Sequence, residues 1–162
     1  MSIARRLKEY LEENRVPYTH CTHRLAYTAQ EVAAAQHVPG REMAKTIVVK
    51  ADDRFMLVIL PAVLKIDMKA LREELPFKHV DLASEKEFAA LFPDSEIGAM
   101  VPFGNLYELS VYVDQSLSAD EEIVFNAGTH VDTIKMKYRD FERLVQPKKI
   151  NAGIRLEMAS GQ

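Results

Sequence analysis

The chain has a single cysteine, Cys21, so it cannot form an internal disulfide bond. One unpaired cysteine suits a reducing compartment, and we expect a cytoplasmic protein. The formal net charge is only -3, so no overall excess of positive charge indicates a non-specific nucleic-acid binder. No apolar run approaches the ~18 residues that span a membrane. The charged N-terminal stretch with Arg5, Arg6 and Lys8 is unlike a signal peptide.

Common catalytic signatures are also missing. The sequence has no GxSxG nucleophile elbow, no Walker phosphate loop and no GxGxxG dinucleotide motif, and no carboxylate pair stands out as acid and base. His20, Cys21 and His23 resemble a metal site at first sight, but strand residues three apart face opposite sides. The other histidines are scattered. We therefore expect neither a metal nor a cofactor.

The composition is that of a globular protein, with 48% hydrophobic and 28% charged residues. At 162 residues we expect one domain spanning 1–162. Apolar spacing and capping patterns predict helices at 3–14, 29–37, 68–75, 85–92 and 139–145, strands at 16–23, 44–49, 55–60, 79–82, 106–114, 123–125 and 129–136, and a loose tail from residue 147. A repeating βαβ pattern is absent. The expected fold class is α+β, a mixed, largely antiparallel, barrel-like sheet of about seven strands with surrounding helices.

The two apolar runs at 44–49 and 55–60 are the most distinctive stretch of the sequence. Both are rich in β-branched residues and are separated by a polar turn, so they predict a β-hairpin. The second run is apolar on both faces, which indicates a central strand. Lys45 shares a face with Ile47 and Val49. A lysine there either extends to the solvent or lies at the mouth of a pocket.

Two glycine-containing loops follow. Residues 98–104 form an unusually apolar loop, which either lies buried beneath a helix or offers its backbone to a ligand. Residues 126–130 begin with a tight turn, and Thr129 and His130 add a hydroxyl and an imidazole.

Three motifs occur in a fixed order: Lys45 within Ala-Lys-Thr-Ile-Val-Val, the GxxxP loop Gly98-Ala99-Met100-Val101-Pro102, and Asn126-Ala127-Gly128-Thr129-His130. In this order they resemble the YbaK/prolyl-tRNA editing-domain family. These proteins are free-standing relatives of the editing domain inserted in bacterial prolyl-tRNA synthetases. The resemblance extends from about Val16 to Val145.

The resemblance implies hydrolysis of the ester that joins a wrong amino acid to tRNA, with Lys45 as the catalytic residue. It also implies that the loop holds the terminal adenosine through its backbone and that the turn closes the amino-acid pocket. The substrate-binding residues would be Thr46, Gly98, Ala99, Met100, Val101, Pro102, Asn126, Gly128, Thr129 and His130. Family members that act on alanyl-tRNA often have Asn after the lysine, whereas this chain has Thr46.

The chemistry agrees with this implication. An aminoacyl ester is already activated, so a site needs only to place water and stabilise the oxyanion. We expect the 2′-hydroxyl of the substrate to assist, and Met100 and Val101 to wall an apolar pocket for a small amino acid. The expected partner is the acceptor end of aminoacyl-tRNA, with transient synthetase contact left open, and neither DNA nor a membrane.

Two alternatives remain at this point. The same fold could bind tRNA or a synthetase without cleaving the ester, or Lys45 could form a Schiff base. A basic region also lies near the C-terminus, formed by Lys135, Lys137, Arg139, Arg143, Lys148, Lys149 and Arg155. It is either an ordinary solvated surface or a path for the acceptor stem that borders the pocket, with contacts from Lys137, Arg139, Lys148 and Lys149.

Overall fold

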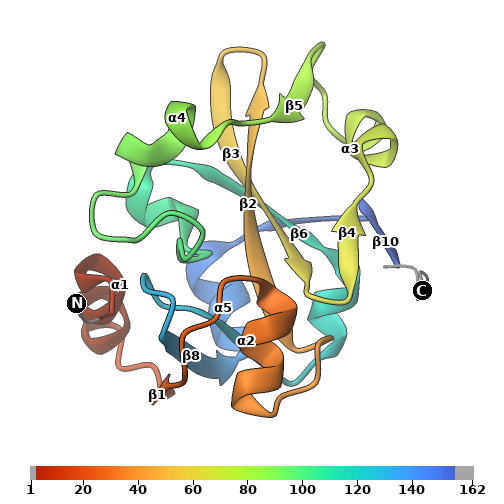
Figure 1. Ribbon diagram of the computed structural model, residues 1–162. Coiled ribbons are helices and arrows are strands. Elements are labelled where there is room, and N and C mark those ends of the chain that lie inside the picture. Colours follow the sequence, from red (N-terminus) through yellow and green to blue (C-terminus); the bar gives the residue numbers. More distant parts are fainter. Residues whose placement is uncertain (1–2, 156–162) are drawn as a thin grey trace.

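The computed structural model describes residues 3–155 (Figure 1). Its α-helices are α1 (Arg5–Glu13), α2 (Ala29–Gln36), α3 (Met68–Glu74), α4 (Glu85–Phe88) and α5 (Tyr138–Val145). Its strands are β1 (Tyr18–Thr22), β2 (Met43–Ala51), β3 (Arg54–Pro61), β4 (Leu64–Ile66), β5 (Val80–Leu82), β6 (Ser110–Asp114), β7 (Glu122–Asn126), β8 (Asp132–Lys137), β9 (Lys148–Ile150) and β10 (Gly153–Arg155). Short 3-10 helices are η1 (Ala89–Leu91), η2 (Gly104–Tyr107) and η3 (Gln115–Ala119). Within this range no helix combines the length and hydrophobicity that a membrane crossing requires.

Most strands join one mixed sheet in the order β1-β8-β7-β2-β3-β6-β9, and β5 also pairs with β2. The β1–β8, β7–β8, β2–β3 and β2–β5 pairs are antiparallel. The β2–β7, β3–β6 and β6–β9 pairs are parallel, while β4 and β10 form a separate antiparallel pair. The predicted α+β class, with a mixed and largely antiparallel sheet surrounded by helices, is confirmed.

The β2–β3 hairpin occupies the middle of this sheet, as the two apolar runs predicted. Its register places Ala44 opposite Pro61 and continues to the turn. Asp52 forms the turn with φ 54°, a left-handed conformation that aspartate tolerates better than most residues. The inner part of β3, residues 57–60, is fully buried, because the protein covers both faces of the sheet.

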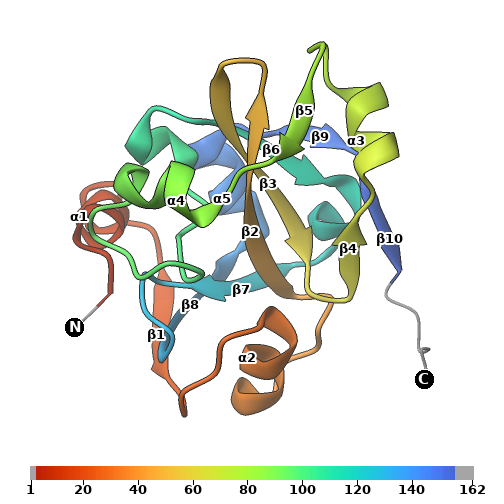
Figure 2. The same cartoon turned by 45° about the horizontal axis from the view of Figure 1, so that its top comes forward.

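The two faces of β2 contact different apolar clusters. Ala44 and Val48 belong to the largest cluster, which includes side chains of α1 and α5. On the other face, Met43 packs with α2, whereas Val49 packs with α3. Lys45 lies between these two on that second face, because side chains alternate along a strand. Figures 1 and 2 show α2 at the end of the hairpin opposite to its turn.

Several parts of the predicted secondary structure are wrong. The strand predicted at 129–136 begins only at Asp132, because the turn extends further than expected. The strand predicted at 106–114 begins only at Ser110, because η2 precedes it and Glu108 has a left-handed φ of 59°. The described part of the tail expected to be loose contains β9 and β10, which pair with β6 and β4; residues 156–162 of that tail lie outside the described range. β4 itself had no prediction. These three-residue strands form against partners far away in the sequence, which local patterns do not reveal.

Candidate active site

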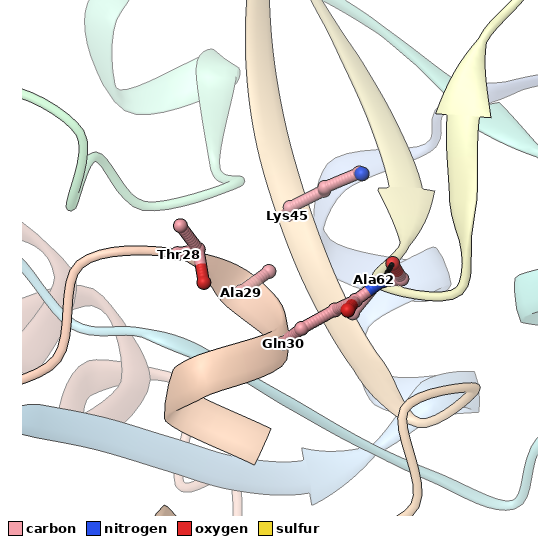
Figure 3. Close-up of a pocket in the computed structure, with 5 residues that line it drawn as sticks. All are labelled: Thr28, Ala29, Gln30, Lys45 and Ala62. Carbon is pink, nitrogen blue, oxygen red and sulfur yellow. Dashed lines mark hydrogen bonds between the residues drawn. The ribbon is translucent and has the colours of Figure 1, made fainter. Parts of the chain in front are cut away.

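A pocket of about 400 Å³ opens beside Lys45 (Figure 3). Lys45 projects from β2, and the other walls are Thr28, Ala29 and Gln30 at the start of α2 and Ala62 after β3. Lys45 therefore lines a pocket, one of the two positions that the sequence left open.

The start of α2 is fixed by hydrogen bonds. Oγ1 of Thr28 accepts from Glu31 N at 3.1 Å, while Oε1 of Glu31 accepts from Thr28 N at 3.1 Å and Tyr27 N at 3.2 Å. This reciprocal capping box satisfies backbone groups that have no partner within the helix. Nε2 of Gln30 donates to the carbonyl oxygen of Ala62 at 3.3 Å. The helix start and the end of the hairpin are thus held together.

Lys45 is a half-buried cation that has no counter-charge within the described residues 3–155. Its ammonium group makes no hydrogen bond or ion pair with any residue in the range 3–155, and burial lowers its pKa from the usual 10.5. The pocket also borders the first turn of α2, where the helix dipole places partial positive charge. Both features favour an anionic or carbonyl oxygen in the pocket.

The Gly98–Pro102 loop and the Asn126–His130 turn lie side by side. Gly128 N donates to the carbonyl oxygen of Ala99 at 3.0 Å, and Glu96 N donates to that of Gly128 at 2.8 Å. Gly128 has φ 104°, which favours glycine. The structure therefore brings together two segments that lie far apart in the sequence.

His130 is held at both its backbone and its ring. Its backbone N–H donates to Oε1 of Glu96 at 2.8 Å, and the ring Nε2 lies 2.9 Å from the carbonyl oxygen of Ile97. A carbonyl oxygen can only accept, so we assign the ring hydrogen to Nε2. Nδ1 is then an acceptor, and it has no hydrogen-bond partner among the described residues.

Tyr27 joins this pair of segments to the Lys45 pocket. Its ring centroid lies 4.8 Å from that of His130, and the N–H of Ala26 donates to the carbonyl oxygen of His130 at 3.4 Å. The next residue, Thr28, lines the pocket. The three segments singled out in the sequence are thus connected through residues 26–28, although neither the loop nor the turn lines the pocket itself.

The side chains of the loop mostly serve the fold. Ala99 and Val101 are fully buried, and Met100 is 6% exposed. Met100 and Val101 belong to the largest apolar cluster, so they do not wall the Lys45 pocket. Gly98 has φ 90°, and a Cβ there would lie 3.2 Å from Cε1 of His130. Thr46 is half-buried on the face of β2 opposite to Lys45.

The turn is closed by a buried carboxylate. Thr129, which precedes β8, donates from Oγ1 to Oδ2 of Asp132 at 2.6 Å, and Nε2 of His20 lies 2.7 Å from Oδ1. Burial raises the pKa of Asp132, but the hydrogen bonds from Thr129 and His20 outweigh it and lower the pKa. Asn126 is also buried, 8% exposed. Residues 3–155 contain no group of three potential ligands placed to hold a metal ion.

The four basic residues expected to contact tRNA are found elsewhere on the protein than in the walls of the Lys45 pocket. Lys137 and Arg139 border a small hollow at the start of α5. Lys149 pairs with Glu142 at 3.0 Å, while Lys148 is exposed on β9. None of these four basic residues lines the Lys45 pocket, and their contact with tRNA stays a prediction.

Sequence reasoning did not find four of the pocket residues, namely Thr28, Ala29, Gln30 and Ala62. The capping pattern of Thr28 and Glu31 correctly located the start of α2. No local signal placed that helix start beside Lys45, because the contact depends on how the chain folds back onto β2.

Comparison with known structures supports the fold. A hypothetical protein matches with a TM-score of 0.82 at 16% identity, over 92% of this chain and 99% of its own. A candidate trans-editing enzyme for prolyl-tRNA synthetase matches with a TM-score of 0.79 at 19% identity, over 93% of this chain and 96% of its own. A candidate signal transduction protein from Marinobacter aquaeolei VT8 has a TM-score of 0.68 at 13% identity, over 92% of this chain and 30% of its own. At these identities the likeness shows the fold alone.

Comparison of sequences gives the family. No curated protein matches the chain. Residues 23–144, more than half of the chain, match the model of the aminoacyl-tRNA editing domain. That range contains Lys45, the Gly98–Pro102 loop and the Asn126–His130 turn. The chain therefore belongs to the aminoacyl-tRNA editing domain family.

Proposed function

We propose that this chain is a trans-acting aminoacyl-tRNA deacylase, which hydrolyses the ester between a wrong amino acid and its tRNA. The observation that carries the proposal is the half-buried ammonium group of Lys45 in a pocket at the start of α2. Membership of the editing domain family supports a tRNA ester as substrate. The shared fold of a candidate trans-editing enzyme for prolyl-tRNA synthetase favours a tRNA(Pro)-type substrate or a small amino acid.

Lys45 would act on the negative charge that develops during hydrolysis. Water adds to the ester carbonyl carbon, and the carbonyl oxygen becomes an oxyanion. The ammonium group of Lys45 and the backbone N–H groups at the start of α2 stabilise this oxygen. The bond to the ribose oxygen then breaks, which releases the free amino acid and the ribose hydroxyl.

The attacking water needs help from the substrate. None of the five residues that line the pocket is a carboxylate or an imidazole. The 2′- or 3′-hydroxyl next to the ester, on the same ribose, can orient the water and relay its proton: it accepts the proton of the water as it gives its own to the departing ribose oxygen. Because an aminoacyl ester is already activated, positioning and oxyanion stabilisation suffice.

The pocket also explains how a second site could discriminate by size. Ala29 and Ala62 supply short walls, so an amino-acid side chain can enter between α2 and the end of β3. One methylene is worth only about 1–3 kcal/mol of discrimination in a synthetase. A differently shaped second site removes the errors that remain.

The test is to incubate the purified protein with a panel of mischarged tRNAs and follow loss of the ester. We expect accelerated loss for at least one small amino acid, and correctly charged tRNA as the control should stay intact. Binding of tRNA without any ester loss across the panel would refute the proposal and favour a non-catalytic binding module.

A further inference from the structure

Tyr27 is exposed, yet its position is fixed. Its side chain is 61% exposed, the largest value among the exposed large apolar side chains described. Its N–H donates to the carboxylate of Glu31 at 3.2 Å, and its neighbour Ala26 donates to the carbonyl oxygen of His130. The ring contacts the imidazole of His130 at a centroid distance of 4.8 Å and an interplanar angle of 51°. The backbone therefore holds an aromatic ring in the solvent.

Tyr27 directly precedes the segment that forms one wall of the Lys45 pocket. The residue after Tyr27, Thr28, lines that pocket. Ile97, whose carbonyl oxygen accepts from His130, is another large apolar residue that is exposed, at 42%. An aminoacyl ester and the last nucleobase of a tRNA are attached to the same ribose. When the ester lies beside Lys45, the unpaired bases at the 3′ end must lie near the pocket mouth.

We propose that Tyr27 is a stacking platform for the terminal nucleobase of the unpaired 3′ end of tRNA. This inference rests on the proposed function, because it requires a tRNA ester in the Lys45 pocket. Aromatic side chains accept the face of any nucleobase, so the platform orients the end of the RNA without reading its sequence. His130 supports the side of the ring that faces the protein, which leaves the other side open to the base.

Stacking of this kind strengthens binding by about 5- to 150-fold per base. The contact is the same in the ground state and the transition state, so its loss should raise KM and leave kcat unchanged. A purely structural role of Tyr27 would instead disturb His130 and the pocket. It would then lower kcat or stability, whatever the nucleobase.

The experiment measures binding of an uncharged RNA hairpin with a single-stranded 3′ end. The terminal nucleotide carries either its base or an abasic sugar. The proteins are the wild type, Tyr27→Ala and Tyr27→Phe, with Leu82→Ala on β5 as a matched control, since Leu82 is 53% exposed and lies outside the site. We expect Tyr27→Ala and removal of the base each to weaken binding by about 5- to 150-fold, with no further loss when they are combined. Tyr27→Phe and Leu82→Ala should bind like the wild type.

Equal affinity of Tyr27→Ala and the wild type for the RNA that keeps its base would overturn the proposal. So would a loss of the same size on abasic RNA, because Tyr27 would then act without the base. In deacylation, an effect on kcat rather than KM would equally reject it. If the wild type hydrolyses no ester, the proposed function fails, but the binding comparison still decides the role of Tyr27.

Discussion

Replacing Lys45 with Met separates a catalytic lysine from a structural one. The substitution keeps an unbranched side chain of similar length in the half-buried position. It breaks no hydrogen bond or ion pair within residues 3–155, because the ammonium group makes none there. We therefore expect the free energy of unfolding to change by no more than about 1 kcal/mol, or a Tm shift of no more than about 4 °C at this chain length. Loss of an oxyanion donor should slow ester hydrolysis by about 100- to 1,000-fold.

The assay combines thermal unfolding with single-turnover hydrolysis of mischarged tRNA. Lys50 provides a matched control on the same strand, because its Nζ pairs with Glu87 at 3.0 Å outside the pocket. Lys50→Met should hydrolyse the ester at the wild-type rate. Lys45→Arg should be as slow as Lys45→Met, since a planar guanidinium does not replace a compact ammonium group. A stable Lys45→Met protein with wild-type turnover would refute the reasoning.

Three further predictions concern the surroundings of the pocket. The folded-state pKa of Asp132 lies below 3.8, so its contribution to stability is present above that pH and is lost as the pH falls below it. The Tm of Asp132→Asn should therefore fall less than that of the wild type as the pH is lowered. An identical dependence of Tm on pH in the two proteins would contradict this prediction. Gly98→Ala forces a strained φ of 90° against His130, so it should lower stability by about 1–3 kcal/mol in chemical denaturation; unchanged stability would show that the loop rearranges freely. Gln30 lines both the Lys45 pocket and a neighbouring pocket of about 480 Å³. Gln30→Ala should join the two pockets and speed hydrolysis of esters of amino acids with larger side chains. Unchanged rates for large relative to small amino acids would show that Gln30 does not limit the size of the accepted side chain.

The sequence was informative where local patterns coincide with the fold. The apolar runs predicted the β2–β3 hairpin, and the strand period correctly placed Lys45 on the same face as Val49. The capping patterns predicted the starts of α2 and α4 correctly, at Ala29 and Glu85. These elements carry their own signal, because burial on a known face requires a regular spacing of apolar residues.

The parts that could not be predicted depend on contacts between distant segments. β9 forms only because Lys148–Ile150 lies beside β6, and nothing within those three residues distinguishes it from a loop. The pocket likewise depends on segments that are distant in the sequence. Ala62 and Thr28 have ordinary side chains, and they lie close together beside Lys45 only because of the path of the whole chain. Met100 and Val101 were expected to wall the pocket because they are apolar, but the same property places them in the core.

The rate at which excess protein releases the amino acid from mischarged tRNA tests the central claim most directly. The wild type and Lys45→Ala should be compared at several tRNA concentrations, against spontaneous hydrolysis of the same ester. The account predicts that the wild type accelerates release and that Lys45→Ala, although folded and able to bind tRNA, is slower by about 100-fold or more. No acceleration by the wild type with any mischarged tRNA, or equal acceleration by both proteins, would contradict it.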